Sequence, residues 1–247
     1  MKNLLIKIVV MIIIGNSLAW SMDKPPKESK SIFGKVKDTF STKLTPEKAT
    51  QKLVDLLNSK NKQITLKDVQ PLIVAGANSN ATNAQGKTVL TIALEQGANI
   101  TLIEFLVNNK AYVQDSTFLV KAARDNNLKK VLLLIKAGAS VDVQHGGVGA
   151  LYWAINHANF DMVKELVSAG ADVNITTVTG NTPLLIALGK IFQNPGETMA
   201  LRNILSVLMS HGAIIDDEVL QKAKETGSKK LLNSLITAPG KLKKKLE

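Results

Sequence analysis

The sequence contains no cysteine, which excludes disulfides, thiolate metal sites, cysteine nucleophiles and lipid attachment through an N-terminal cysteine. Aromatic residues make up only 4% of the 247 residues, while 45% are hydrophobic. The core must therefore be built from Leu, Ile, Val and Ala, which suits thin stacked helices better than a large globular core.

Recognisable catalytic and metal-binding motifs are also absent. The three histidines, 145, 157 and 211, lack metal-ligand spacing, and there is no H-E-x-x-H or G-x-S-x-G motif. The segment 145–149, H-G-G-V-G, superficially resembles a phosphate loop, but it has neither the third glycine of a dinucleotide fingerprint nor a following Lys-Ser/Thr. We expect a turn there, and we predict a non-enzymatic protein without metal or cofactor.

The formal charge of +11 is concentrated at the two ends of the chain. Residues 1–45 carry eight lysines and three acids, and residues 238–247 carry four lysines and one acid, which leaves 19 basic and 16 acidic residues between them. The middle lacks the basic and aromatic stripe of a nucleic-acid site. We therefore predict no specific nucleic-acid binding, and a basic tail over residues 238–247.

No apolar run reaches the roughly 20 residues that a transmembrane helix needs. Residues 1–21 instead show the three parts of a secretory signal: Lys2 and Lys7, the apolar run 8–14, and small residues at Ala19 and Ser21 before the expected cut. Cleavage after Ala19 is a variant, and an uncleaved N-terminal anchor is the alternative. The signal predicts an exported protein, either periplasmic or secreted.

Residues 22–45 form a basic linker whose first part is rich in proline and lysine. Phe33, Val36, Phe40 and Leu44 recur at helical spacing, so this linker is either mostly disordered or a short amphipathic helix. As a helix, residues 30–45 could make weak contact with an anionic membrane surface.

Two stretches of the chain, 117–142 and 149–174, can be laid on each other without a gap. Both contain Ala-Gly-Ala near their ends, at 137–139 and 169–171, and self-similarity over a few tens of residues indicates a solenoid. The matching pairs are Leu119 with Leu151, Ala122 with Ala154, Leu128 with Phe160, Val131 with Val163, and Leu134 with Leu166. Small alanines at one repeated position predict close approach of neighbouring helices, and the leucines fill the core between them.

Similar unit openings recur along most of the chain. They are T-V-L-T-I-A at 88, T-F-L-V-K-A at 117, G-A-L-Y-W-A at 149, T-P-L-L-I-A at 182 and, faintly, E-V-L-Q-K-A at 218, with a first unit near 46. The pattern resembles the ankyrin repeat family, whose unit of about 33 residues has two helices and a β-turn finger. The resemblance implies an all-α solenoid of five or six helix-turn-helix units over residues 46–237.

Three departures from the family pattern stand out. The fourth position of the unit, which is His in the family, is Thr91, Val120, Tyr152 or Leu185, so the usual His hydrogen bonds are expected to be missing. Only residues 113–116 are left for the finger before Thr117, and the unit from Thr182 carries about nine extra residues within 189–203. This insertion either lengthens both helices of its unit or makes a protruding loop.

The resemblance implies binding of a protein partner, not yet identified, on the concave surface made of finger tips and first helices. We expect a monomer that serves as a host-directed effector or a periplasmic binding protein, and the bias towards Lys, Asn and Ile suggests a bacterial origin. The alternative is a membrane-associated structural protein tethered by its N-terminal segment. The candidate partner-binding residues are Asn83, Gln85, Lys87, Glu95, Gln96, Arg124, Asp125, His145, Val148, Asn156, His157, Thr177, Thr179 and Asn181.

Overall fold

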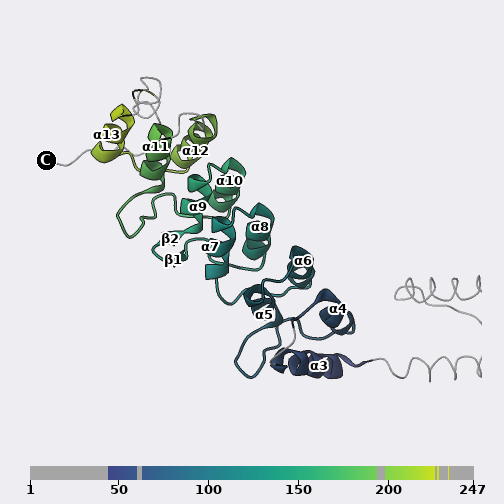
Figure 1. Ribbon diagram of the computed structural model, residues 1–247. Helices are drawn as coiled ribbons and strands as arrows, with labels where there is room; N and C mark the ends of the chain where they lie inside the picture. The colour runs from purple at the N-terminus through teal and green to yellow at the C-terminus, as the bar shows by residue number, and fades with distance from the viewer. Residues whose placement is uncertain (1–43, 60–62, 194–197, 226, 228–232, 234–247) are drawn as a thin grey trace, which may run out of the picture. The chain divides into compact units, whose positions relative to one another are not determined.

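Short helices in consecutive pairs make up the part of the chain that the structure describes (Figure 1). The structure is a computed structural model and describes residues 44–59, 63–193, 198–225, 227 and 233. Within these residues there are eleven helices and one two-stranded hairpin, which confirms the all-α solenoid. The helices are α3 (Pro46–Asn58), α4 (Leu66–Val74), α5 (Val89–Glu95), α6 (Ile100–Asn108), α7 (Thr117–Arg124), α8 (Leu128–Lys136), α9 (Ala150–Asn156), α10 (Phe160–Ser168), α11 (Pro183–Gln193), α12 (Thr198–Ser210) and α13 (Asp217–Glu225).

The helices are arranged in two layers. Each first helix packs on its own second helix, so that α3 lies on α4, α5 on α6, α7 on α8, α9 on α10 and α11 on α12. Second helices pack in chain order from α4 to α12, and first helices do so from α7 to α13. Each pair therefore completes its core with its neighbours, as expected for repeats that cannot bury their apolar face alone.

Polar side chains mark the helix starts that the sequence pattern predicts. The hydroxyls of Thr45 and Thr88 accept hydrogen bonds from the backbone amides of Lys48 and Thr91. Second helices use asparagine instead, since Asn127 and Asn159 accept from the amides three residues later. Each such cap satisfies one of the backbone amides that have no partner within the helix.

The helix ends show why Ala-Gly-Ala recurs. Gly138 and Gly170 have φ of 85° and 93°, in the left-handed region where a side chain is unfavourable. Lys110 occupies this position after α6 and also has positive φ, 64°, so the chain keeps the turn without glycine.

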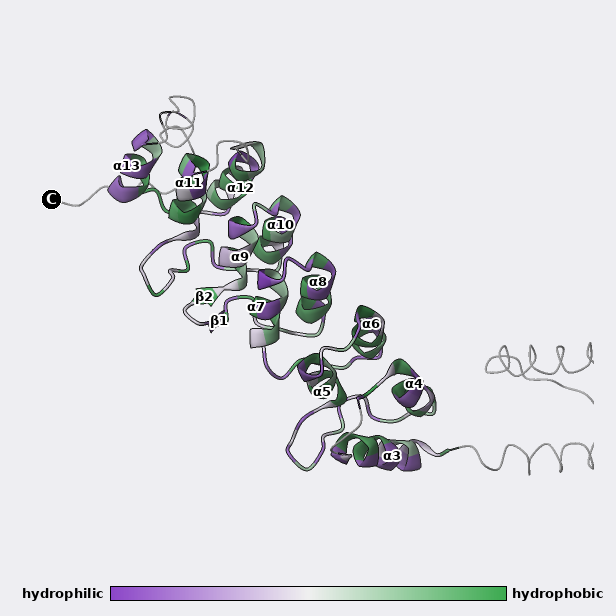
Figure 2. Cartoon of the chain, viewed as in Figure 1, coloured by the Kyte–Doolittle hydropathy of each residue, from purple (hydrophilic) through white to green (hydrophobic). Residues whose placement is uncertain are grey.

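The core is aliphatic and continuous between the two layers. The first-helix alanines 93, 122, 154 and 187 are at most 1% exposed, and the leucines 90, 119, 151 and 184 at most 2%. Figure 2 shows most helices with one hydrophobic side and one hydrophilic side. The repeated Ala and Leu positions of the sequence are thus the packing positions of the first-helix layer.

The insertion lengthens both helices of its unit. Helices α5 to α10 have seven to nine residues, whereas α11 has 11 and α12 has 13. The turn signal at 194–197 lies outside the described residues.

Several predictions about the chain ends also fall outside the described residues. They concern the signal at 1–21, nearly all of the linker at 22–45, and the tail at 238–247. Among the helices that the structure does describe, none is long and apolar enough to span a bilayer.

Candidate partner-binding surface

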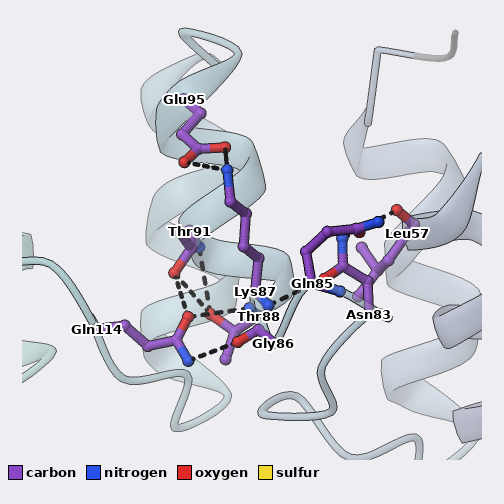
Figure 3. A network of polar contacts seen from close by, with 9 residues as sticks. All are labelled: Leu57, Asn83, Gln85, Gly86, Lys87, Thr88, Thr91, Glu95 and Gln114. Carbon is purple, nitrogen blue, oxygen red and sulfur yellow. Dashed lines mark hydrogen bonds and ion pairs between the residues drawn. The ribbon is translucent and has the colours of Figure 1, made fainter. Parts of the chain in front are cut away.

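Asn83 shapes the first complete finger, residues 78–88. Its side-chain oxygen accepts hydrogen bonds from the backbone amides of Gln85 and Lys87, at 3.0 and 2.9 Å, as Figure 3 shows. Asn83 is half-buried, whereas Gln85 at the tip is exposed. Asn83 therefore sets the turn, and Gln85 is the residue of this pair whose side chain faces solvent.

Lys87 and Glu95 form an ion pair across the first helix of this unit. Lys87 Nζ lies 2.7 Å from the Glu95 carboxylate, and both side chains are more than 40% exposed (Figure 3). Such an exposed pair contributes at most about 1 kcal/mol to stability, so both charges remain usable by a partner. Gln96 faces the preceding unit instead, because its Oε1 accepts from the amide of Ile64 at 2.8 Å.

Gln114 was not among the predicted site residues, yet it takes part in a network of hydrogen bonds with this finger and α5 (Figure 3). Its Oε1 accepts from the Thr91 hydroxyl at 2.8 Å and from the Thr88 amide at 3.1 Å, while Nε2 donates to the Gly86 carbonyl at 3.0 Å. Thr88 and Thr91 are buried. The fourth position has no histidine, as the sequence shows, but at Thr91 its hydroxyl still donates a hydrogen bond, to Gln114.

A sequence signal for Gln114 does exist. It lies three residues after Ala111, as Asn80, Asp142 and Asn174 lie three residues after their own alanines. Asn80 and Asn174 reach forward, each accepting a backbone amide of the next unit, from Tyr112 and Ile214. Gln114 reaches backward because the finger that would follow it is too short.

Asp115 follows in the shortened finger and is held as a carboxylate. Burial acts to raise its pKa, but hydrogen bonds from Thr117 and the nearby charges of Lys121 and His145 lower the pKa below its ordinary value. One of these hydrogen bonds joins the Thr117 amide to Asp115 Oδ1 at 2.9 Å. His145 is thereby placed near an acidic group.

Two neighbouring fingers interlock beyond this point. Strands β1 (Gln144–His145) and β2 (Val148–Gly149) form a hairpin, so the turn expected at 145–149 is confirmed. Gln144 Nε2 donates to the Thr176 carbonyl at 2.8 Å, and the Val178 amide donates to the Gly147 carbonyl at 3.1 Å. The structure thus brings His145 and Val148 of one finger close to the finger at 177–181.

The threonines of the second of these fingers are bonded to one another. The Thr177 and Thr179 hydroxyls lie 2.9 Å apart, and Asn181 Nδ2 donates to Thr179 Oγ1 at 2.9 Å. Thr179 and Asn181 are nevertheless exposed. These residues hold the finger in shape and still present polar groups to solvent.

A small, mainly apolar groove opens between the two fingers and the first helices behind them. Tyr152 projects from α9, while Pro183 and Ile186 come from α11. Tyr152 is half-buried and packs edge-to-face on Trp153, with ring centroids 5.2 Å apart. The lining residues are Gln144, Gly149, Tyr152, Ile175, Thr176, Thr177, Pro183 and Ile186.

The remaining predicted residues lie at the C-terminal ends of α7 and α9. Arg124 and Asp125 are exposed and only loosely paired, at 3.9 Å. His157 stacks on Trp153 and its Nε2 lies 2.9 Å from the Arg124 carbonyl. Asn156 is half-buried, and its carbonyl accepts a hydrogen bond from Lys190, a residue that the sequence reading did not single out.

The predicted site residues therefore form three groups rather than one. Asn83, Gln85, Lys87 and Glu95 lie at the first complete finger, and His145, Val148, Thr177, Thr179 and Asn181 lie at the interlocked fingers. Arg124, Asp125, Asn156 and His157 lie at the helix ends, and Gln96 faces the unit before it. Within the described ranges no three His, Asp or Glu residues are grouped as metal ligands would be.

Replacing Gly147 by Ala should disturb the interlocked fingers, whereas Gly146→Ala should not. Both glycines have positive φ, 80° and 63°, so both variants carry the same kind of backbone strain. A Cβ on Gly147 would meet Val178 Cγ1 at 2.4 Å, but one on Gly146 would meet no atom within 4 Å. We expect the amide chemical shifts of 176–181 to change in Gly147→Ala alone. Equal changes in both variants would contradict this contact.

Comparison with known proteins gives the same repeat. A family model described as ankyrin repeats in three copies matches residues 57–145 and 119–219, which together cover more than half of the chain. The putative ankyrin repeat protein YahD of Escherichia coli (strain K12) is 31% identical over 185 residues, with 69% of this chain and 89% of that protein covered. A crystal structure of an ankyrin repeat domain from Acinetobacter baumannii AYE superposes with a TM-score of 0.53 at 25% identity, covering 71% of this chain and 93% of that one.

Vertebrate relatives match over a small part of their length. The nuclear factor NF-kappa-B p105 subunit of Gallus gallus is 34% identical over 134 residues, which is 50% of this chain and 14% of that protein. Because the family pattern, the paired helices and the turn fingers coincide along 57–219, the chain belongs to the ankyrin repeat family, whose domains are generally protein–protein interaction modules and usually not enzymes.

Proposed function

We propose that this chain is an exported protein–protein interaction module that binds a partner protein at the groove between α9 and α11. The observation that carries the proposal is the groove itself, in which apolar side chains of two first helices lie open between two interlocked fingers. Protein interfaces have an apolar centre surrounded by a polar rim, and the walls of this shallow groove offer such an apolar contact surface. Here the rim consists of Gln144, Thr176 and Thr177.

The surroundings of the groove suit a protein partner. Val178, next to the groove on the second finger, is 79% exposed and extends the apolar surface that a partner would contact. The hydrogen bonds from Gln144 and Val178 hold the two fingers together before a partner arrives. A preformed surface loses less conformational entropy on binding, which favours affinity.

Export is the second part of the proposal and is supported by the sequence pattern of residues 1–21. An exported ankyrin domain could serve as a host-directed effector or as a periplasmic binding protein. Both roles need the same partner-binding surface, and they differ in where the partner resides.

The test uses a C-terminally tagged full-length chain produced in a bacterial cell that exports it. The N-terminus of the recovered protein should be Met22 or Trp20, and a start at Met1 would contradict a cleaved signal and favour the uncleaved anchor. Proteins that co-purify after crosslinking are then quantified by mass spectrometry, first from the bacterial cell envelope and then from eukaryotic host extract.

Matched variants decide whether the groove is used. Thr176→Lys places a charge at the groove, while Thr101→Lys makes the same change at an exposed position on α6. We expect Thr176→Lys to reduce capture of the same partner about tenfold or more, because a buried charge at an interface is costly. Equal capture by both variants would refute the groove as the binding site.

A further inference from the structure

The packing of the first helices on one another changes between α5 and α7. Helix α7 packs closely on α9, α9 on α11, and α11 on α13, whereas α5 and α7 do not pack closely in the described residues (Figure 1). Helix α5 does not pack closely on α3 either, but that junction keeps a complete finger, 78–88, whose Asn83 and Ala84 bond to Leu57 and Asn58. The junction between α5 and α7 has no such finger.

A ladder of side-chain donors joins the later first helices. His157 Nε2 bonds to the Arg124 carbonyl at the end of α7, and Lys190 Nζ bonds to the Asn156 carbonyl at the end of α9. Both donors lie eight residues after the start of their unit, at Gly149 and Thr182. Each rung satisfies a carbonyl that has no partner within its helix.

The same position in the unit from Thr117 is Asp125. An ionised carboxylate accepts hydrogen bonds but cannot donate one, so Asp125 cannot bond to the Glu95 carbonyl at the end of α5. The ladder is therefore interrupted where the finger is shortened and where the first helices lie apart. Three independent features of the chain coincide at one junction.

The second-helix layer remains joined at this junction. Helix α6 packs on α8, Lys129 Nζ lies 2.7 Å from the Glu104 carboxylate, and Lys136 Nζ donates to Asn108 Oδ1 at 2.8 Å. On the first-helix side, Gln114 lies in the segment between α6 and α7 and makes three hydrogen bonds back to the α5 unit, with Gly86 and Thr88 of its finger and Thr91 of its helix. At this junction the second helices are therefore packed together, whereas on the first-helix side the hydrogen bonds of Gln114 hold the connecting segment.

We propose that the solenoid contains a hinge between α5 and α7, which pivots about α6 and α8 and is closed by Gln114. Residues 46–108 form one cooperative block and residues 117–225 form a second, more stable block. Opening changes the distance from Lys87 and Glu95 to Arg124 and Asp125, so it adjusts the first-helix surface. The hinge goes beyond the proposed function, because it depends on the packing of this chain and not on any partner.

Hydrogen exchange of the full-length chain, followed by mass spectrometry, tests the hinge. If the two blocks exist, protection rises in one step between them. Helices α3 to α6 then share one free energy of opening, and α7 to α10 share a higher one, so exchange in α7 to α10 is slower by about tenfold or more. Fraying from the chain end would instead give a gradual rise in protection from α3 to α8. A gradual rise, or equal protection on both sides of residues 109–116, would overturn the proposal.

Three variants separate the latch from general destabilisation. Gln114→Ala should speed exchange in α5 and α6 about fivefold or more while leaving α9 and α10 unchanged, since it removes the hydrogen bonds that tie the segment 109–116 to Gly86, Thr88 and Thr91 of the first block. Asn174→Ala, at the equivalent position of a continuous junction, should leave α5 and α6 unchanged. If Gln114→Ala speeds exchange equally in all helices, the latch is refuted.

Asp125→Lys should supply the hydrogen bond that is missing between the ends of α7 and α5. A lysine has the reach and the donors to bond to the Glu95 carbonyl, as Lys190 does to Asn156. We expect exchange in α5 to slow, and the step between the two blocks to shrink. Unchanged exchange in α5 would count against the interrupted ladder as the cause of the hinge.

Discussion

Replacing Leu151 by Ala is expected to lower the free energy of unfolding by about 2–5 kcal/mol, because it leaves a cavity in a closely packed core. Leu151 is 2% exposed and lies on α9, which packs on α7, α10 and α11 at once. The helix that carries this buried side chain is thus held on three sides. Urea unfolding followed by circular dichroism measures the change.

Leu132→Ala is the matched control for this cavity. Leu132 lies on α8 and is 39% exposed, so the same truncation removes less buried surface. We expect a loss below about 1 kcal/mol. If Leu151→Ala proved as stable as Leu132→Ala, the repeat register that places Leu151 in the core would be wrong.

Ala154→Leu is the second variant with a large expected effect, a loss of about 1–3 kcal/mol through overpacking. Ala154 is fully buried on α9, which packs on α7 within the first-helix layer. Three added carbon atoms would force these helices apart or into strained rotamers. The thermal unfolding midpoint should fall accordingly.

Ala84→Leu supplies the control for added volume. Ala84 is exposed in the finger at 78–88, so a leucine there meets solvent rather than a neighbouring helix. Its unfolding midpoint should stay close to that of the unchanged protein. A tolerated Ala154→Leu would mean that the small residue is not needed for the approach of α7 and α9.

The repeat pattern was enough to predict the helices and their packing faces, because each unit uses the same small set of positions. Leu151 and Ala154 could be assigned to the core from their match with Leu119 and Ala122 alone. The conformation of the helix end at Lys110 was harder to predict. A lysine can occupy the left-handed region at some energetic cost, so the sequence left both outcomes open and the structure shows the turn kept.

The candidate surface could be predicted only in part. Fingers and first-helix ends were correctly expected to carry polar residues, but polarity alone did not distinguish a residue that faces a partner from one that holds a turn. Asn83 holds its finger, Gln96 bonds to the preceding unit and His157 reaches the Arg124 carbonyl. The Asn83 contact is local, between residues two apart, but the contacts of Gln96 and His157 span 32 and 33 residues and depend on how the units stack.

The sequence by itself determined the repeat, the core positions and the places where the pattern is broken, because these follow from residue type and spacing within one unit. Only the tertiary structure decided what the breaks mean: that the insertion lengthens α11 and α12, that Gln114 turns back to the preceding finger, and that Lys190 binds α9. The physical reason is that these outcomes depend on contacts between units, across 23 to 34 residues of chain, where the direction of a side chain is set by the neighbouring helix and not by its own sequence.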